Sequence, residues 1–259
     1  AVENIDEIIE ASDGIMVARG DLGIEVPYYD VPTIQKMLIK KANLKGIPVI
    51  TATQMLLSMT QNERATRAEI SDVANAVLDG TDVVMLSEES AVGEDPINVV
   101  DTMHNIIAKT EGIYNYDKQY EMPYLDEFDV IQATVTKLAD DLKANGILAI
   151  TSSGKSALKM SRYRPKTPIF TFTHKKKVLN SLTAIWGVEP IGIIKEAQAS
   201  KMFQKMLVAL DERGLLNKNG LYVATVGYPV GMPGSTNTIK ILTPSEIEYY
   251  LNFKDKKAK

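Results

Sequence analysis

The sequence contains no cysteine, only two histidines and no long apolar run. The absence of cysteine excludes disulfides, thiolate metal sites and thiol catalysis. A three-histidine zinc site or a Ser-His-Asp triad would have to draw on His104 and His174 alone. Metal chemistry must therefore rest on carboxylates, which favour magnesium or manganese. No apolar stretch approaches the roughly 18 residues that cross a bilayer, so we expect no membrane partner.

The chain also lacks an excess of positive charge. Lys and Arg number 29 against 33 Asp and Glu, which gives a net charge of −4. A basic face that could hold a nucleic-acid backbone is therefore not expected. The length of 259 residues suffices for one large α/β domain or two ordinary ones. Because no secretory signal stands at Ala1, the expected compartment is the cytoplasm.

Short apolar runs alternate with longer amphipathic stretches, which is the pattern of βα units in a parallel sheet. Three such units in about 115 residues cannot close an eight-stranded barrel, which takes roughly 250 residues. The first region is thus either a small open sheet or part of a barrel, and the absence of an initiator Met favours a fragment. Its predicted strands are 14–18, 48–53 and 82–87, and its predicted helices 31–45, 66–78 and 95–113, the last capped by Asp95 before Pro96.

A polar and aromatic segment near residues 114–126 interrupts this pattern, and the alternation then starts again. About five strands with helices between them suit a small doubly wound three-layer domain. The predicted strands are 147–151, 168–173, 188–193, 221–226 and 238–242, and the predicted helices 130–144, 155–164, 175–186 and 197–214.

Polar residues follow the first two predicted strands. Gly20 and Gly23 would let the backbone turn sharply with exposed N–H groups, while Asp21 would offer a carboxylate to magnesium. The hydroxyl of Thr53 can donate to a carboxylate or phosphate oxygen. The structural alternatives are a turn capped by the aspartate and an ordinary strand threonine.

The third predicted strand ends at Ser87, two residues before Glu89. A carboxylate at this spacing could polarise the hydroxyl or a water molecule in a proton relay. The alternative is that both residues simply begin the following loop. Because a barrel collects its strand ends into one site, we expect all three strand ends to contribute to it.

A second candidate site joins a predicted strand to a helix at residues 151–156. Hydroxyls, a glycine and a lysine at a helix N-terminus place donors and one cation where an anion would bind, although helix capping is the alternative. The GxxxxGK[ST] spacing is not present, so ATP hydrolysis is not predicted. A long Gly/Pro/Ser loop at residues 227–236 favours a further binding role. The candidate residues are Thr151, Ser152, Ser153, Gly154, Lys155, Ser156, Gly231, Gly234, Ser235 and Thr236.

Several motifs resemble the pyruvate kinase family. MVARGDLGIEVP (16–27), PVITATQML (48–56), ATRAEISDVANAVLDGTD (65–82) and VMLSEESAVGEDP (84–96) are similar to the last three strand ends of its catalytic barrel. GKSA (154–157), SRYRPKTPIF (161–170) and GSTNTIKI (234–241) resemble its C-terminal effector domain. The resemblance implies part of a (β/α)8 TIM barrel at 1–114, a linker at 115–128 and a three-layer αβα doubly wound effector and oligomerisation domain at 129–259.

The resemblance also implies phosphoryl transfer from phosphoenolpyruvate to ADP, giving pyruvate and ATP, with Mg²⁺ (or Mn²⁺) and K⁺. Asp21 would match the second metal ligand, Gly20 the backbone donor to substrate, and Thr53 the hydroxyl at the substrate carboxylate or phosphoryl group. Ser87 with Glu89 would match the proton-transfer network. A homotetramer and a sugar-phosphate or nucleotide effector are implied as well.

Departures from the family pattern are also present. Glu88 stands where the family often has Gly, and Ser90 where it usually has Thr. The family's Lys-Ile-Glu motif, which supplies a phosphoryl-stabilising lysine and the first metal ligand, would lie before Ala1, as would the nucleotide and K⁺ contacts and the lid domain. We therefore expect a C-terminal half that is inactive alone. The alternatives are a noncatalytic phosphometabolite-binding and oligomerisation module and a metal-dependent lyase, against which the second domain argues.

Overall fold

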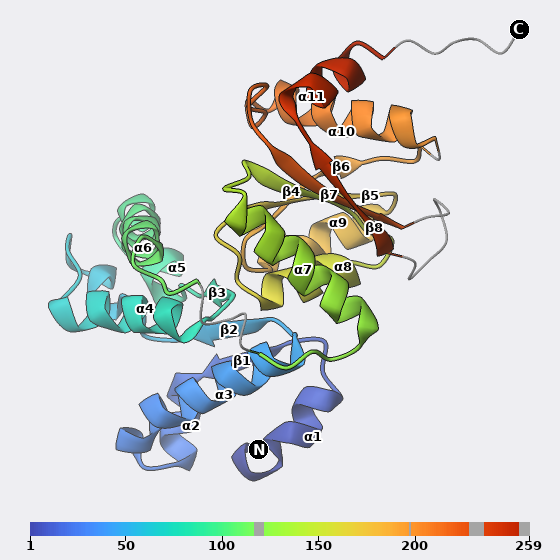
Figure 1. The fold of residues 1–259 in the computed structure, drawn as a ribbon. Helices are drawn as coiled ribbons and strands as arrows, with labels where there is room; N and C mark the ends of the chain where they lie inside the picture. Colours follow the sequence, from blue (N-terminus) through green and yellow to red (C-terminus); the bar gives the residue numbers. More distant parts are fainter. Residues whose placement is uncertain (117–121, 197, 228–235, 254–259) are drawn as a thin grey trace, which may run out of the picture. The chain divides into compact units, whose positions relative to one another are not determined.

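A computed structural model describes residues 1–116, 122–196, 198–227 and 236–253 of the chain. The chain divides into two compact units, Ala1–Tyr116 and Asp117–Lys259. Each unit has its own sheet and its own buried core (Figure 1).

The first unit is built on a three-stranded sheet in the order β1-β2-β3, with both strand pairs parallel. A helix follows each strand, as the βα pattern predicts. The strands are β1 (Ile15–Ala18), β2 (Val49–Ala52) and β3 (Val83–Val84). The helices are α1 (Ile5–Glu10), α2 (Arg19–Glu25), α3 (Val31–Lys45), α4 (Arg67–Asp79), α5 (Glu88–Ala91) and α6 (Pro96–Glu111), with 3-10 turns η1 (Val2–Asn4), η2 (Tyr28–Asp30) and η3 (Leu57–Thr60).

Local signals fix the ends of the longer helices. The Asp95 side chain accepts a hydrogen bond from the Asn98 N–H at the start of α6, so the predicted cap is confirmed. A capping box begins α4, in which Thr66 and Glu69 satisfy each other's backbone N–H groups. Helix α3 ends at Gly46, whose φ of 77° is left-handed and suits glycine.

The first unit differs from the sequence-based expectation at helices α1 and α5, which were not predicted, and at two further elements. The glycines after β1 do not form a turn, because helix α2 begins directly at Arg19 and includes both. Strand β3 has two residues rather than the six predicted. Met85 still donates to the Thr51 carbonyl, but the Ser87 N–H donates to the Glu89 side chain instead, so the chain leaves the strand ladder there.

The second unit contains a five-stranded sheet in the order β6-β5-β4-β7-β8. Strands β4 to β7 are parallel, and β8 runs antiparallel to β7 at one edge. The strands are β4 (Gly146–Ile150), β5 (Ile169–Thr173), β6 (Val188–Ile193), β7 (Tyr222–Gly227) and β8 (Thr236–Leu242). The helices are α7 (Glu127–Asp141), α8 (Lys155–Arg162), α9 (Lys176–Ser181), α10 (Ala199–Glu212) and α11 (Pro244–Leu251), with the 3-10 turn η5 (Leu182–Ala184).

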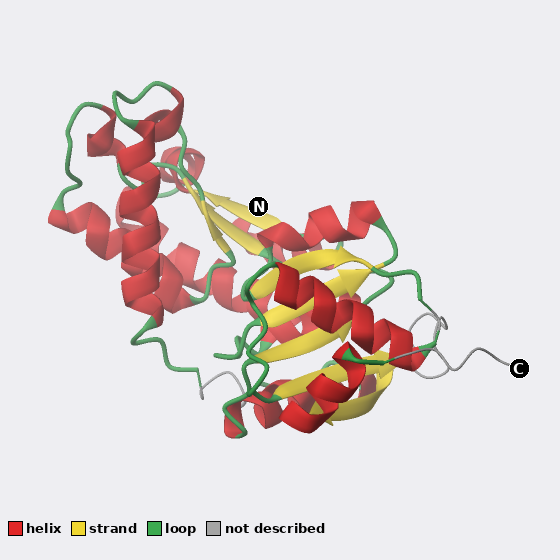
Figure 2. Ribbon diagram, turned by 90° about the horizontal axis from the view of Figure 1, so that it is seen from above, coloured by secondary structure: helices red, strands yellow, loops and turns green. Residues whose placement is uncertain are grey.

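Helices cover both faces of this sheet, which makes a three-layer αβα arrangement (Figures 1 and 2). Leu148 packs with side chains of α10 and α11, whereas its neighbours Ile147 and Ala149 pack with α7 and α8. This alternation follows from the two-residue period of a strand, and both faces are apolar because both are buried.

Strand β4 lies at the point where the order of the sheet reverses. The chain continues from β4 through β5 to β6 on one side, and β7 pairs with the other side of β4. Doubly wound sheets bind ligands at the carboxyl ends of strands at such a point. The predicted helix 175–186 is wrong in its length, because α9 ends at Ser181 and a 3-10 turn follows. Helix α11 was not predicted, although its Thr243 and Glu246 capping box was visible in the sequence.

Candidate functional site

A strained turn stands at the carboxyl end of β2. Thr53 and Gln54 both have left-handed backbone conformations, with φ of 71° and 55°. A β-branched residue such as threonine rarely adopts this region, so neighbouring groups must hold the turn in place. Strain of this kind concentrates at functional sites.

The turn joins the end of β2 to the end of β1. The Gly20 N–H donates to Thr53 Oγ1 at 2.9 Å, and Thr53 Oγ1 donates to the Ala52 carbonyl at 2.6 Å. Two residues that the sequence singled out separately are therefore in direct contact. A Cβ built on Gly20 would meet Thr53 only at an ordinary distance of 3.7 Å, so the described surroundings do not themselves require a glycine there.

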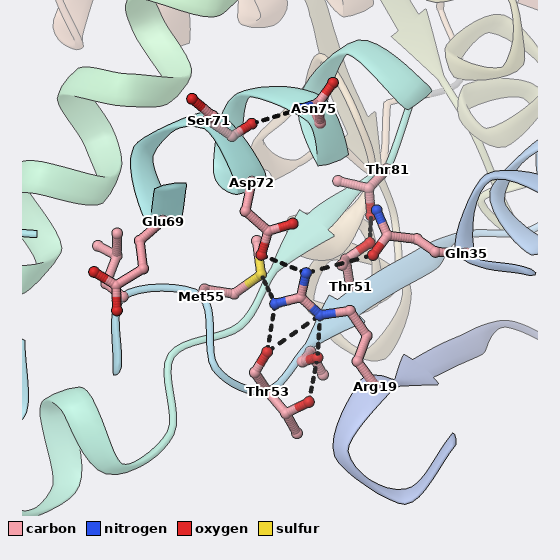
Figure 3. A network of polar contacts seen from close by, with 12 residues as sticks. Arg19, Gln35, Thr51, Thr53, Met55, Glu69, Ser71, Asp72, Asn75 and Thr81 are labelled. Atoms are coloured by element: carbon pink, nitrogen blue, oxygen red, sulfur yellow. Dashed lines mark hydrogen bonds and ion pairs between the residues drawn. The ribbon is translucent and has the colours of Figure 1, made fainter. Parts of the chain in front are cut away.

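Arg19 lies at the centre of this region (Figure 3). Its Nε donates to the carbonyl oxygens of Ala52 and Thr53, each at 3.2 Å, and Nη2 also donates to the Thr53 carbonyl. Its Nη1 lies 2.5 Å from Asp72 Oδ2, and Gln35 Oε1 accepts from the same nitrogen at 3.5 Å. Arg19 and its ion-pair partner Asp72 were not predicted from the sequence as site residues. The available signal was a charged residue placed directly at the end of an apolar strand.

Asp21 is exposed in the first turn of α2, next to Gly20. Within the described residues, no group of three or more His, Cys, Asp or Glu side chains converges to hold a metal ion. A lone carboxylate supplies one of the roughly six oxygen ligands that magnesium requires. Asp21 can therefore fill only part of a coordination sphere.

Glu89 links the end of the third strand to the segment after β2. Its side chain is 1% exposed, Oε1 accepts from the Leu56 N–H at 3.2 Å, and Oε2 accepts from the Ser87 N–H at 2.7 Å. The predicted relay has the carboxylate polarise the Ser87 hydroxyl or a water molecule, and in the structure the carboxylate accepts from the Ser87 backbone N–H. Glu89 therefore holds Ser87 through its backbone, and the relay itself stays a prediction.

The second candidate site lies at the end of β4, where the sheet order reverses. Gly154 is the N-cap of α8, with a left-handed φ of 88° and no capping side chain. The Thr151 hydroxyl accepts from the Gly154 N–H at 2.9 Å, before the helix begins. The Thr151 hydroxyl is therefore used within the turn before the helix, and because Gly154 offers no capping side chain, the first N–H groups of α8 are suited to an anion.

The loop residues of this site are only partly described. Ser156 Oγ lies 3.1 Å from Thr236 Oγ1, so the start of α8 is close to the start of β8. Lys155 and Ser153 are exposed, and Ser152 is half-buried. The other predicted residues of the loop, Gly231, Gly234 and Ser235, lie outside the described residues.

Family models match both units. A model described as pyruvate kinase, barrel domain, matches residues 1–100, and one described as pyruvate kinase, alpha/beta domain, matches residues 129–242. The chain belongs to the pyruvate kinase family. This confirms the resemblance and the predicted fold class, a barrel segment followed by an α/β domain. The exact limits of the domains and of the linker stay a prediction.

Individual pyruvate kinases are similar along most of the chain. A relative from Clostridium acetobutylicum is 47% identical over 93% of this chain and 52% of its own length. A relative from Geobacillus stearothermophilus is 46% identical over 95% of this chain and 43% of its own length. The crystal structure of a pyruvate kinase from Cryptosporidium parvum matches with a TM-score of 0.87 and 37% identity, over 93% of this chain and 49% of that one. The chain thus spans about half the length of the pyruvate kinases that it matches.

Over the described ranges, no helix is both long and apolar enough to cross a bilayer.

Proposed function

We propose that this chain supplies substrate-positioning groups to a pyruvate kinase that transfers a phosphoryl group from phosphoenolpyruvate to ADP. The hydrogen bond between the Gly20 N–H and Thr53 Oγ1 carries the proposal. It brings the Gly20 N–H and the Thr53 hydroxyl together at adjacent strand ends, on a strained turn. Donors fixed in advance are what phosphoryl transfer requires, because its catalysis depends mainly on positioning and charge stabilisation.

Each residue of the site then has a separate task. When phosphoenolpyruvate binds, the Gly20 N–H and the Thr53 hydroxyl exchange their bonds to Thr53 Oγ1 and to the Ala52 carbonyl for bonds to its anionic oxygens, and Asp21 contributes one oxygen ligand to Mg²⁺ (or Mn²⁺). Magnesium, when bound, neutralises charge on the transferred group. Ser87, held through its backbone by Glu89, takes part in protonating the enolate. The remaining metal ligands, the K⁺ contacts and the nucleotide contacts come from other parts of a pyruvate kinase.

The second unit fits an effector role. The N-terminus of α8, with its hydroxyl groups and Lys155, suits the phosphate of a sugar phosphate or a nucleotide. Allosteric control through this site, assembly as a homotetramer and a cytoplasmic location accompany the proposal as predictions.

A noncatalytic module that binds phosphometabolites and mediates oligomerisation is the second candidate. The observation that favours it is that the described residues contain no group of three metal-binding side chains. In this reading the first unit would contribute only an interface.

Activity measurements separate the two candidates. A polypeptide of these 259 residues and a complemented enzyme are assayed with lactate dehydrogenase coupling. The complemented enzyme joins these residues to the part of the Geobacillus stearothermophilus relative that the match does not cover. We expect no turnover from the polypeptide and about 1–100 turnovers per second from the complemented enzyme. Turnover by the polypeptide alone would refute the need for the missing ligands, and a folded but inactive complemented enzyme would support the noncatalytic module.

Asp21→Asn in the complemented enzyme tests the metal assignment. The change removes the charge with little change of volume, so turnover should fall and the Mg²⁺ concentration needed for half-maximal rate should rise. Glu25→Gln, an exposed change near the other end of α2, is the control and should leave both values unchanged. An unchanged Mg²⁺ requirement in Asp21→Asn would remove this residue from the metal site.

A further inference from the structure

The turn after β2 does not keep its conformation by its own preference. Thr53 and its neighbour Gln54 are both left-handed, and neither is a glycine. Each residue in such a conformation disfavours it by about 5- to 150-fold for a free chain. Other contacts must therefore compensate for it.

The guanidinium group of Arg19 makes those contacts. Its Nε bridges the carbonyl oxygens of Ala52 and Thr53, and Nη2 adds a contact to the Thr53 carbonyl and one to Met55 Sδ at 2.8 Å. The guanidinium group is planar and its N–H donors point in fixed directions. It can therefore hold two successive carbonyl groups in one orientation. The Arg19 side chain is only 12% exposed, so little water competes for these bonds.

Two other helices hold the guanidinium group itself in place. Asp72 of α4 pairs with Nη1 at 2.5 Å, and Gln35 of α3 accepts from the same nitrogen at 3.5 Å. Figure 3 shows the guanidinium between Asp72 on one side and Thr53 on the other. The donors that face the turn and those that face the helices are therefore separate, and no single nitrogen has to serve both.

We propose that Arg19 is a positioning residue that holds the turn in its left-handed form and thereby aligns the Thr53 hydroxyl with the Gly20 N–H. The inference rests on the proposed function, since it assigns Arg19 to the binding of phosphoenolpyruvate through Thr53. Arg19 itself donates to backbone carbonyl groups, so its assigned role acts through Thr53.

Three substitutions test this assignment in the complemented enzyme. Arg19→Met removes the guanidinium group but keeps an unbranched side chain. Arg19→Lys keeps the positive charge without the planar guanidinium group. Gln54→Gly relieves the strain, because glycine adopts positive φ freely. We expect Arg19→Met to raise the KM for phosphoenolpyruvate about 10- to 100-fold and the KM for ADP less than about twofold, with Arg19→Lys in between. Adding Gln54→Gly to Arg19→Met should lower the KM for phosphoenolpyruvate several-fold relative to Arg19→Met alone. A merely structural role would not allow this rescue.

Lys36→Met is the matched control, since it also removes a cation paired with an aspartate, Asp79, at 2.5 Å on these helices. It should leave both KM values unchanged. Equal effects of Arg19→Met on both substrates, without rescue by Gln54→Gly, would overturn the proposal.

Amide hydrogen exchange on the 259-residue polypeptide separates this inference from the proposed function. Arg19→Met should speed exchange of the Gly20 amide at least about tenfold, because its acceptor Thr53 Oγ1 is released, whereas Lys36→Met should not. If the unsubstituted complemented enzyme is inactive, the proposed function fails, and this measurement still decides whether Arg19 holds the turn. Unchanged exchange in Arg19→Met and Arg19→Lys would refute the inference.

Discussion

Arg162 and Asp129 form an ion pair inside the second unit, with 2.9 Å between Nη1 and Oδ2 and both side chains 0% exposed. The same oxygen accepts from the Tyr163 hydroxyl and from the Leu125 N–H, each at 2.8 Å. Arg162 Nη2 also donates to the Pro123 carbonyl at 2.8 Å. Burial, together with the hydrogen bond to Asp129, raises the pKa of the Tyr163 hydroxyl. The cluster anchors the segment before α7 to the end of α8.

Asp129→Asn should destabilise the second unit by about 3–5 kcal/mol, because it leaves a buried arginine charge without its partner. Urea unfolding followed by circular dichroism measures the change. The control is Asp141→Asn, since Asp141 pairs with Lys137 on the surface and more than half of each side chain is exposed. That control should change the free energy of unfolding by less than about 0.5 kcal/mol. Equal losses in both variants would contradict the role of the buried pair.

The stability of the first unit should depend on the charge of Glu69. Burial alone would raise the pKa of this carboxyl, but hydrogen bonds from the backbone and hydroxyl groups of Ser58 and Thr66 outweigh burial and lower it below the ordinary 4.5. The ionised group therefore stabilises the fold fully above that value, and this contribution disappears as the pH falls through the lowered pKa.

Glu69→Gln should accordingly reduce the free energy of unfolding at pH 7, and the difference from the unsubstituted chain should shrink as the pH falls below 4.5. Denaturant titrations over this pH range measure both values. Glu63→Gln is the control, because the Glu63 side chain is exposed and the bond from Asn98 goes to its backbone carbonyl, which the substitution keeps. If the difference in the free energy of unfolding instead grew toward low pH, the inference that folding lowers the pKa of Glu69 would be wrong.

Ser87→Ala and Glu89→Gln should have different effects in the complemented enzyme. Ser87→Ala removes only the hydroxyl, so it should slow protonation of the enolate more than phosphoryl transfer, with little change in stability. Glu89→Gln places an amide group against backbone N–H donors, so it should also lower stability by about 1–3 kcal/mol. The two half-reactions and the thermal unfolding of each variant are measured. If Ser87→Ala slowed both half-reactions equally, the proton-transfer role would be wrong.

Lys155→Ala should weaken the binding of a phosphorylated metabolite to the second unit by about 1–3 kcal/mol, the usual range for a hydrogen bond to a charged group. Calorimetry on the full chain with fructose 1,6-bisphosphate, ribose 5-phosphate and AMP measures it. Lys218→Ala is the control, because this exposed lysine lies after α10 and pairs with Asp211 in the last turn of that helix. If none of these compounds bound to the folded chain, or if one bound equally well without Lys155, the phosphate site would be rejected.

The sequence by itself determined the alternation of strands with the longer helices, the two sheets except for the antiparallel edge strand β8, and the family. Hydrophobic periodicity and capping residues act over a few neighbouring positions, so they fixed helices such as α3 and α6 closely. The motifs also identified Gly20, Thr53 and Glu89 as residues of interest. Helix α2 was missed because glycine usually signals a turn, and here contacts from elsewhere in the chain outweigh that local preference.

Only the tertiary structure decided how these residues act. Arg19 meets Thr53 at a separation of 34 residues and Asp72 at 53, and Glu89 meets Leu56 at 33. Such hydrogen bonds depend on the register of neighbouring strands and on the packing of helices against them, which no local pattern encodes. The strained turn after β2 is the clearest case. Threonine and glutamine do not favour a left-handed backbone, so only bonds from distant residues can hold them in it.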